Sequence, residues 1–377
     1  MKNINIIYRG YILLNKSEVS EIKKQYGIKD CGLGRVVGRY IGPEGDIRAS
    51  FNKTFLMKEE EEQHKYLSMF KKSLSGGIGK TLNTFEINDI QRRNNLSGLV
   101  STGLVEGSQG VIDAFFDMVS DEINDHSEFV GGYLMALVSN DYDVPNRNDD
   151  GLKDGESTEV YSYIHFILCP VSPEKAGLMY DGNNEIIKKE LRQVVEDPVL
   201  GFIYPSFEDR TSDDEKVTVY VKKGDSFFDG VITGVLGCEV TPSYSEQRSM
   251  CEELIARMAE EKVTGAEKIE AIKSVVQDFV NRSDEGLKSF IKKDEVKAVL
   301  EKQGATEDMV DDVVGDLEEM SVAAVCVPDV SVSGEGYSLK VSAERAHLFT
   351  RKEINGKEYL MIEVPAGETV TVNGIEG

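Results

Sequence analysis

Residues 129–139 read FVGGYLMALVS, a run in which nearly every side chain is apolar. A strand covered on both faces has such a continuous apolar run, whereas a half-exposed strand alternates apolar and polar residues. We therefore expect a buried strand over Phe129–Ser139, and we expect the polar loop Asn146–Ser157 to follow it.

Helices and strands are predicted on both sides of this run. Upstream, apolar periodicity and cap signals predict helices at Asn15–Gln25, Lys58–Leu74 and Val111–Ile123. Turn signals predict a pair of strands at Gly34–Ile41 and Asp46–Phe55. Downstream, they predict three strands and a helix near Val160–Leu168, Leu200–Tyr204, Val217–Lys222 and Phe227–Leu236. Because these elements mix without a regular βαβ alternation, the sequence predicts an α+β fold.

The composition changes after residue 242. Four helical segments are expected, at Ser245–Lys262, Ala266–Asn281, Lys293–Lys302 and Glu307–Met320. The tail returns to strands, at Val322–Val327, at Tyr337–Val341 and in a hairpin that turns at Asn355-Gly356, the preferred type I′ pair. We thus expect a mixed-sheet portion over 15–242, a helical section over 243–320 and a C-terminal β portion over 321–377.

The start of the chain, residues 1–14, lies before the first folding signal. Asn15 and Glu18 have capping-box spacing and begin the first helical pattern. We expect residues 1–14 to be an untranslated leader that a misplaced start includes in the sequence.

Charge and composition limit the classes of function. The chain has 377 residues, with 43 Lys and Arg against 67 Asp and Glu, a formal net charge of −24, and 40% hydrophobic residues. That is enough apolar material for hydrophobic cores. The net negative charge repels phosphate groups and argues against nucleic-acid binding. No apolar run is long enough for a membrane helix. Five scattered cysteines form no CxxC motif and indicate a reducing, cytoplasmic environment.

One glycine-rich stretch resembles the end of a phosphate-binding loop, through Gly76, Gly77, Gly79, Lys80 and Thr81. Leu74 stands where the first glycine of that motif belongs, and the stretch follows an amphipathic helix rather than a buried strand. We therefore expect a helix end and a loop, and no nucleotide cofactor.

No metal site is expected either. The loop Asn146–Ser157 begins like a calcium-binding loop, but Ser157 stands where the bidentate Glu should be. The four histidines have no metal-ligand spacing, and His165 is expected to lie in the core or an interface of its strand.

A weaker site hypothesis rests on acidic residues. Asp141 and Asp143 follow the apolar run, and Pro205–Arg210 follows the strand Leu200–Tyr204 with Glu208, Asp209 and Arg210. Strand-end loops often carry sites, and these residues could supply an acid–base group and an anion contact. An ordinary turn with an Arg–carboxylate contact is the simpler interpretation.

Several stretches carry a resemblance to a known family. They include NKSEVSEIKK at Asn15–Lys24, YDVP at Tyr142–Pro145, YSYIHFILCPVSPEKAGLMYD at Tyr161–Asp181, and KVSAERAHLFTRKEINGKEYLMI at Lys340–Ile362. The chain resembles the bacterial domain-of-unknown-function family 4317 from Asn15 onward. The resemblance implies relatives and no particular reaction.

Three functions stay open at this point. The preferred one is a cytosolic, non-catalytic protein-binding or regulatory factor with a protein partner, because no complete catalytic or cofactor motif is present. The second is an enzyme with its site near Asp141–Asp143 and Pro205–Arg210. The third is a translation-associated, ribosome-binding factor, an analogy of size and organisation that the net charge disfavours unless one face is basic. Oligomeric state is left open.

Overall fold

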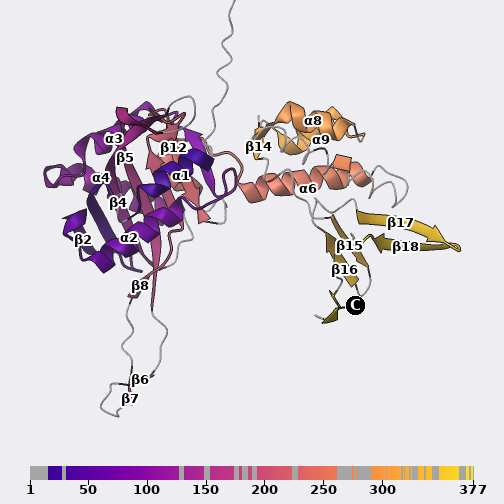
Figure 1. The fold of residues 1–377 in the computed structure, drawn as a ribbon, viewed down its shortest axis with the longest axis horizontal. Coiled ribbons are helices and arrows are strands. Elements are labelled where there is room, and N and C mark those ends of the chain that lie inside the picture. The colour runs from indigo at the N-terminus through magenta and orange to yellow at the C-terminus, as the bar shows by residue number, and fades with distance from the viewer. Residues whose placement is uncertain are drawn as a thin grey trace, which may run out of the picture. The chain divides into compact units, whose positions relative to one another are not determined.

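The computed structural model forms two compact units, Met1–Thr241 and Pro242–Gly377, and each is described by itself (Figure 1). The structure describes residues 16–27, 31–126, 131–147, 153–173, 178–180, 186–188, 193–222, 228–260, 274–275, 278, 290–302, 304–315, 317, 319–321, 324, 330–334, 337–341, 348–364, 371–372 and 375–376.

The first unit is built on one antiparallel sheet. Its strand order is β2-β1-β4-β5-β9-β12-β3, and the short strand β8 pairs with β5. The strands are β1 (Leu33–Ile41), β2 (Ile47–Thr54), β3 (Leu82–Glu86), β4 (Gly132–Arg147), β5 (Lys153–Pro173), β8 (Gln193–Val195), β9 (Leu200–Tyr204) and β12 (Lys216–Val221). Helices and an antiparallel sheet in one unit confirm the α+β prediction.

Helices cover both faces of this sheet. Ile22 of α1 (Lys16–Lys24) and Phe70 of α2 (Glu60–Ser73) pack in one hydrophobic cluster with side chains of β1, β4 and β5 (Figure 1). The opposite face packs on α3 (Ile90–Thr102), α4 (Gln109–His126) and α5 (Asp229–Gly234). The 129–139 run is apolar throughout because β4 sends alternate side chains into two cores.

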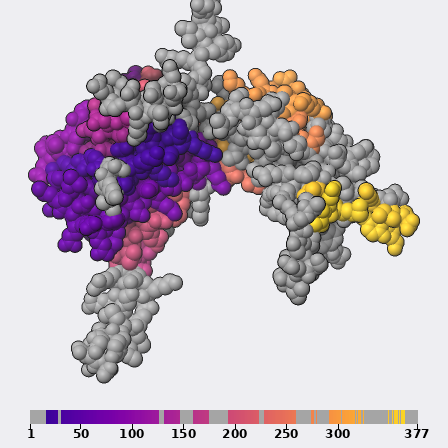
Figure 2. Space-filling model, in the orientation of Figure 1, coloured from indigo at the N-terminus to yellow at the C-terminus, as the bar shows by residue number. Residues whose placement is uncertain are grey.

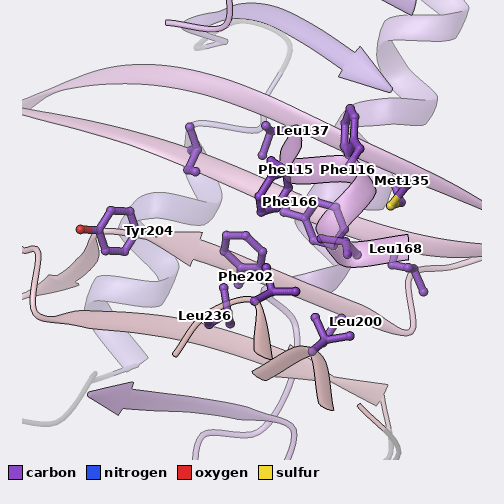
Figure 3. Close-up of a cluster of buried hydrophobic side chains, with 14 of the residues drawn as sticks. Phe115, Phe116, Met135, Leu137, Phe166, Leu168, Leu200, Phe202, Tyr204 and Leu236 are labelled. Carbon is purple, nitrogen blue, oxygen red and sulfur yellow. The ribbon is translucent and has the colours of Figure 1, made fainter. Parts of the chain in front are cut away.

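Aromatic side chains dominate the core on the α3–α5 face. Phe115 of α4 meets the rings of Phe166 and Phe202 edge to face, with centroids 5.6 and 6.1 Å apart, and the latter two rings stack at 5.2 Å (Figure 3). Arg39 of β1 also ties α4 to the sheet, through hydrogen bonds to Asp113 and Asp117.

The sequence pattern predicts neither β3 nor α3 of the first unit. Only Leu96 and Leu99 of α3 are buried, so its apolar stripe is too short to predict a helix. The expected strand Phe129–Ser139 begins too early and ends too early: its first two residues lie outside the described residues, and β4 begins at Gly132. β4 continues to Arg147 because its pairing with β5 runs on through polar residues, so Asp141 and Asp143 lie within a strand.

The second unit has a helical core and several hairpins. Helices α6 (Tyr244–Glu260), α8 (Lys293–Glu301) and α9 (Glu307–Val314) bury Leu254, Val299 and Val310 together. The expected helix Glu307–Met320 ends early, at Gly315 with a φ of +57°, and Glu319–Ser321 (β14) pairs with Phe290–Lys292 (β13) instead. Most of the expected segments Ala266–Asn281 and Val322–Val327 lie outside the described residues.

The tail of the second unit forms three hairpins among the described residues, of which the sequence predicts the one that turns at Asn355-Gly356. β15 (Val330–Gly334) pairs with β16 (Tyr337–Val341), and β19 (Thr371–Val372) pairs with β20 (Ile375–Glu376). Between them, β17 (Phe349–Ile354) pairs with β18 (Lys357–Ile362) across Asn355 and Gly356, whose φ angles of +54° and +73° fit the predicted type I′ turn.

Candidate functional site

The segment 206–213 folds as a small hairpin at the end of the sheet. β10 (Ser206–Glu208) and β11 (Thr211–Asp213) pair antiparallel, and the two residues between them make the turn. Both turn residues are left-handed, Asp209 at a φ of +49° and Arg210 at +60°. Asn and Gly are the usual residues here, and a left-handed Arg costs about 1–2 kcal/mol, so contacts of the turn must offset that cost.

Arg210 makes those contacts with the first helix. Its guanidinium donates two hydrogen bonds to the carboxylate of Glu21, at 3.2 and 2.9 Å, and a third to the carbonyl of Pro145 at 2.6 Å. Tyr142 donates to the same carboxylate at 2.7 Å. Hydrogen bonding to Glu21 raises the pKa of Arg210, so the buried carboxylate of Glu21 faces a fixed positive charge.

Glu208 is held in a second ion pair of the same hairpin. Lys216 of β12 donates to Glu208 at 2.8 Å and lies 3.1 Å from Asp213. Ser206 lies 3.4 Å from Glu208 and 2.8 Å from the hydroxyl of Thr218. Burial raises the pKa of Glu208, while its hydrogen bond with Lys216 acts in the opposite direction.

The two predicted acidic groups are not brought together on one face. Asp141 and Asp143 are exposed, and they alternate along β4 with the buried Tyr142, which bonds to Glu21. Alternate side chains of a strand point to opposite faces, so both carboxylates lie on the face away from Arg210. Asp209 is exposed at the tip of the turn.

The glycine-rich stretch forms a tight loop after α2. The backbone N–H groups of Lys80, Thr81 and Leu82 all bond to the carbonyl of Gly77, and that of Gly79 bonds to Leu82. A phosphate-binding loop points its N–H groups at the ligand, whereas these are used within the loop. This geometry fits the interpretation of Gly76–Thr81 as a helix end.

His165 is the centre of a polar chain inside the α1–α2 core. Its Nδ1 is 2.5 Å from the hydroxyl of Tyr26, and its Nε2 is 2.8 Å from Ser73 Oγ. Ser73 donates its own proton to the carbonyl of Phe70, so Nε2 is the protonated nitrogen and Nδ1 accepts from Tyr26. Burial lowers the pKa of His165 to about 3, and all three side chains are almost fully buried.

Free cysteine thiols lie in both units of the chain. Cys31, Cys169, Cys238 and Cys251 are free, and burial raises the pKa of the Cys238 thiol to about 12. Cys326 lies outside the described residues. Within the described part of the chain, no three His, Cys, Asp or Glu side chains are grouped so that they could hold a metal ion. No described helix is long and apolar enough to cross a membrane.

The fold and this hairpin define an α+β protein with a two-faced antiparallel sheet and a charged clamp between α1 and β10–β11. The family model for the domain of unknown function DUF4317 matches residues 14–375, and the chain belongs to this family. That match confirms the resemblance seen in the sequence. No curated protein and no solved structure matches the chain.

Sequence reasoning missed Glu21, Tyr142 and Lys216, which hold the predicted residues in place. Glu21 belongs to the first predicted helix, but it contacts Arg210 across 189 positions of sequence. A mixed apolar and acidic helix gives no signal for such a long-range partner. The one local indication of a buried partner was that the Glu21 carboxylate stands next to the apolar Ile22.

Proposed function

We propose that the protein is a non-catalytic binding factor that acts through a protein partner in the cytoplasm. The observation that carries this proposal is a set of exposed apolar side chains on the β17–β18 hairpin and directly after it. Ile354 and Tyr359 are 43% and 44% exposed on one face, Ile362 is 46% exposed on the other face, and Val364, after β18, is 49% exposed. Figure 2 shows the yellow segment around β17 and β18 exposed on the viewed face. Large apolar side chains left exposed on one short hairpin are typical of a segment that docks on another surface.

The hairpin itself supports this interpretation. Among the described residues, β17 and β18 pair only with each other. A two-stranded hairpin is marginally stable in water and gains stability when a further surface covers its apolar side chains. The free thiols of the four described cysteines support a reducing compartment such as the cytoplasm.

The charged clamp of the first unit favours a binding factor over an enzyme. Arg210 and Lys216 are each paired with a buried carboxylate, Glu21 and Glu208 respectively. Ion pairs of this kind fix elements in place, because separating either partner leaves a buried charge. The clamp therefore suits a scaffold that holds α1 against the sheet.

Affinity purification of the full-length protein from its native cell tests this function. A variant with Ile354→Ser and Tyr359→Ser is compared with wild type and with a control variant, Ile47→Ser and Ile90→Ser, which changes two exposed residues of the first unit. We expect a stoichiometric protein partner that the control retains and the hairpin variant loses at least tenfold. A partner that all three proteins retain equally, or no partner at all, would contradict the proposal.

An enzyme is the second candidate, and two features of the β10–β11 hairpin favour it. Consecutive left-handed residues at Asp209 and Arg210 are the kind of strain that gathers at sites, and burial raises the pKa of Glu208. A metabolite screen by thermal shift tests it, with wild type and Glu208→Gln side by side. A compound that stabilises wild type and loses its effect in the variant would favour the enzyme.

A further inference from the structure

The β17–β18 hairpin has one face on which apolar and basic residues alternate across the strands. In the register, Lys352 lies opposite Tyr359, and Ile354 lies opposite Lys357. Directly opposed residues share a face, and residues two apart on one strand share it as well. These four residues therefore form one continuous face next to the turn, which we call the Lys-Tyr face.

The Lys-Tyr face is exposed and positively charged. All four of its residues are exposed, and neither lysine has an ion pair with an acidic residue in the described parts of the chain. By contrast, residues 242–377 hold 16 Lys and Arg against 28 Asp and Glu, a formal net charge of −12. A small basic face on an acidic unit attracts a ligand with a short acidic stretch.

The same charge balance argues against a nucleic acid on this face. A nucleic-acid strand carries a charge at every nucleotide, and its affinity comes from neutralising many phosphates at once. Two lysines offer few such contacts, and the net charge of −12 on the rest of the unit repels the remaining phosphates of the strand. A protein segment can place one or two carboxylates at the lysines and remain apolar between them.

We propose that the Lys-Tyr face binds an extended protein segment in which acidic and apolar side chains alternate at i and i+2. This inference rests on the proposed binding function and names the chemistry of the partner. In an extended chain, residues i and i+2 lie about 7 Å apart on one face. That spacing matches the steps from Lys352 to Ile354 and from Lys357 to Tyr359 along each strand. Each carboxylate pairs with a lysine, and each apolar side chain packs on Ile354 or Tyr359.

Fluorescence anisotropy with three labelled twelve-residue peptides tests this inference on the full-length protein. The probe repeats Glu-Ser-Leu-Ser, the charge control repeats Gln-Ser-Leu-Ser, and the apolar control repeats Glu-Ser-Ser-Ser. We expect the probe to bind at least tenfold more tightly than either control and to weaken as salt rises from 50 to 500 mM. A twelve-nucleotide oligouridine is the nucleic-acid arm, and we expect it to bind more weakly than the probe.

Two variants complete the test. Lys352→Gln with Lys357→Gln removes only the charge of the Lys-Tyr face, and we expect it to weaken binding of the probe at least tenfold. Lys24→Gln with Lys53→Gln removes two exposed lysines of the first unit and should leave binding unchanged.

Failure of this inference is distinguishable from failure of the binding function. Equal binding of the Glu and Gln peptides overturns the acidic partner even if a co-purified protein still depends on Tyr359. Tighter binding of oligouridine than of the probe overturns it as well. If no co-purified protein depends on Tyr359, the proposed binding function itself fails.

Discussion

Arg210 holds Glu21 with two hydrogen bonds of 3.2 and 2.9 Å, although the two residues stand 189 positions apart. The arginine belongs to a turn in an unfavourable left-handed conformation, and the glutamate belongs to the first helix. The contact therefore fastens the first described helix to a hairpin near the end of the first unit. Its first role is structural, because it holds α1 on the hairpin.

The clamp should protect α1. We expect Arg210→Ala to destabilise the first unit by about 2 kcal/mol, less than for a fully buried pair because the arginine side chain is 23% exposed. The exchange of α1 amide hydrogens, measured by mass spectrometry on the full chain, should rise at least tenfold. Arg48→Ala is the matched control, since its ion pairs are exposed and worth little. Unchanged exchange in α1 would show that Arg210 does not hold the helix.

Local chemistry made much of the fold predictable. The strand pair predicted at Gly34–Ile41 and Asp46–Phe55 and the hairpin predicted at Asn355-Gly356 follow from local residue preferences, and both hairpins are present. The clamp could not be predicted in this way, because Glu21 and Arg210 meet only through the packing of the whole unit. For the same reason, sequence alone could not show that Asp141 and Asp143 point away from Arg210.

His165 should make the first unit sensitive to acid. Burial lowers its pKa to about 3, against an ordinary value of 6.5 in the unfolded chain. The unfolded state therefore binds a proton first as the pH falls, so this contribution to stability is complete above pH 6.5 and is lost between pH 6.5 and about 3. The full shift corresponds to a loss on the order of 5 kcal/mol.

Urea unfolding between pH 7 and 4, followed by hydrogen exchange of β4 and β5 in the first unit, measures this effect in wild type and His165→Gln. Carboxylates titrate in the same range in both proteins, so the difference between the two slopes isolates the histidine. We expect the variant to be less stable at pH 7 and to lose less stability toward pH 4. His64→Gln, at an exposed position on α2, should keep the wild-type slope. Parallel slopes for His165→Gln and wild type would refute the role of His165.

The described cysteines should differ in reactivity. Cys169, Cys238 and Cys251 are buried, whereas Cys31 is only partly buried, and burial raises the pKa of the Cys31, Cys169 and Cys238 thiols. Because a thiol must be accessible as well as ionised to react, we expect iodoacetamide to modify Cys31 at least tenfold faster than the other three in the native protein. Peptide mass spectrometry over a time course measures this order. Equal rates in urea serve as the control, and equal rates without urea would contradict the burial of Cys169.

The stacked rings of Phe166 and Phe202 should be the most costly part of the sheet core to disturb. Phe166 of β5 is fully buried, and its ring packs against Phe202 of β9 and Phe115 of α4, so a smaller side chain leaves a cavity in a close-packed core. We expect Phe166→Ala to destabilise the first unit by about 3–5 kcal/mol. Leu56→Ala, at a side chain 66% exposed, should change stability by about 0.5 kcal/mol or less.

Hydrogen exchange of β5 and β9 in mild urea reads out the effect of Phe166→Ala within the first unit alone. Protection of these strands should fall strongly, while protection of α8 and α9 in the second unit should stay at the wild-type level. This contrast matters because the chain forms two compact units, so a single unfolding midpoint would mix their stabilities. Equal loss of protection in both units would mean that the two unfold together, and the aromatic core would then stabilise the whole chain.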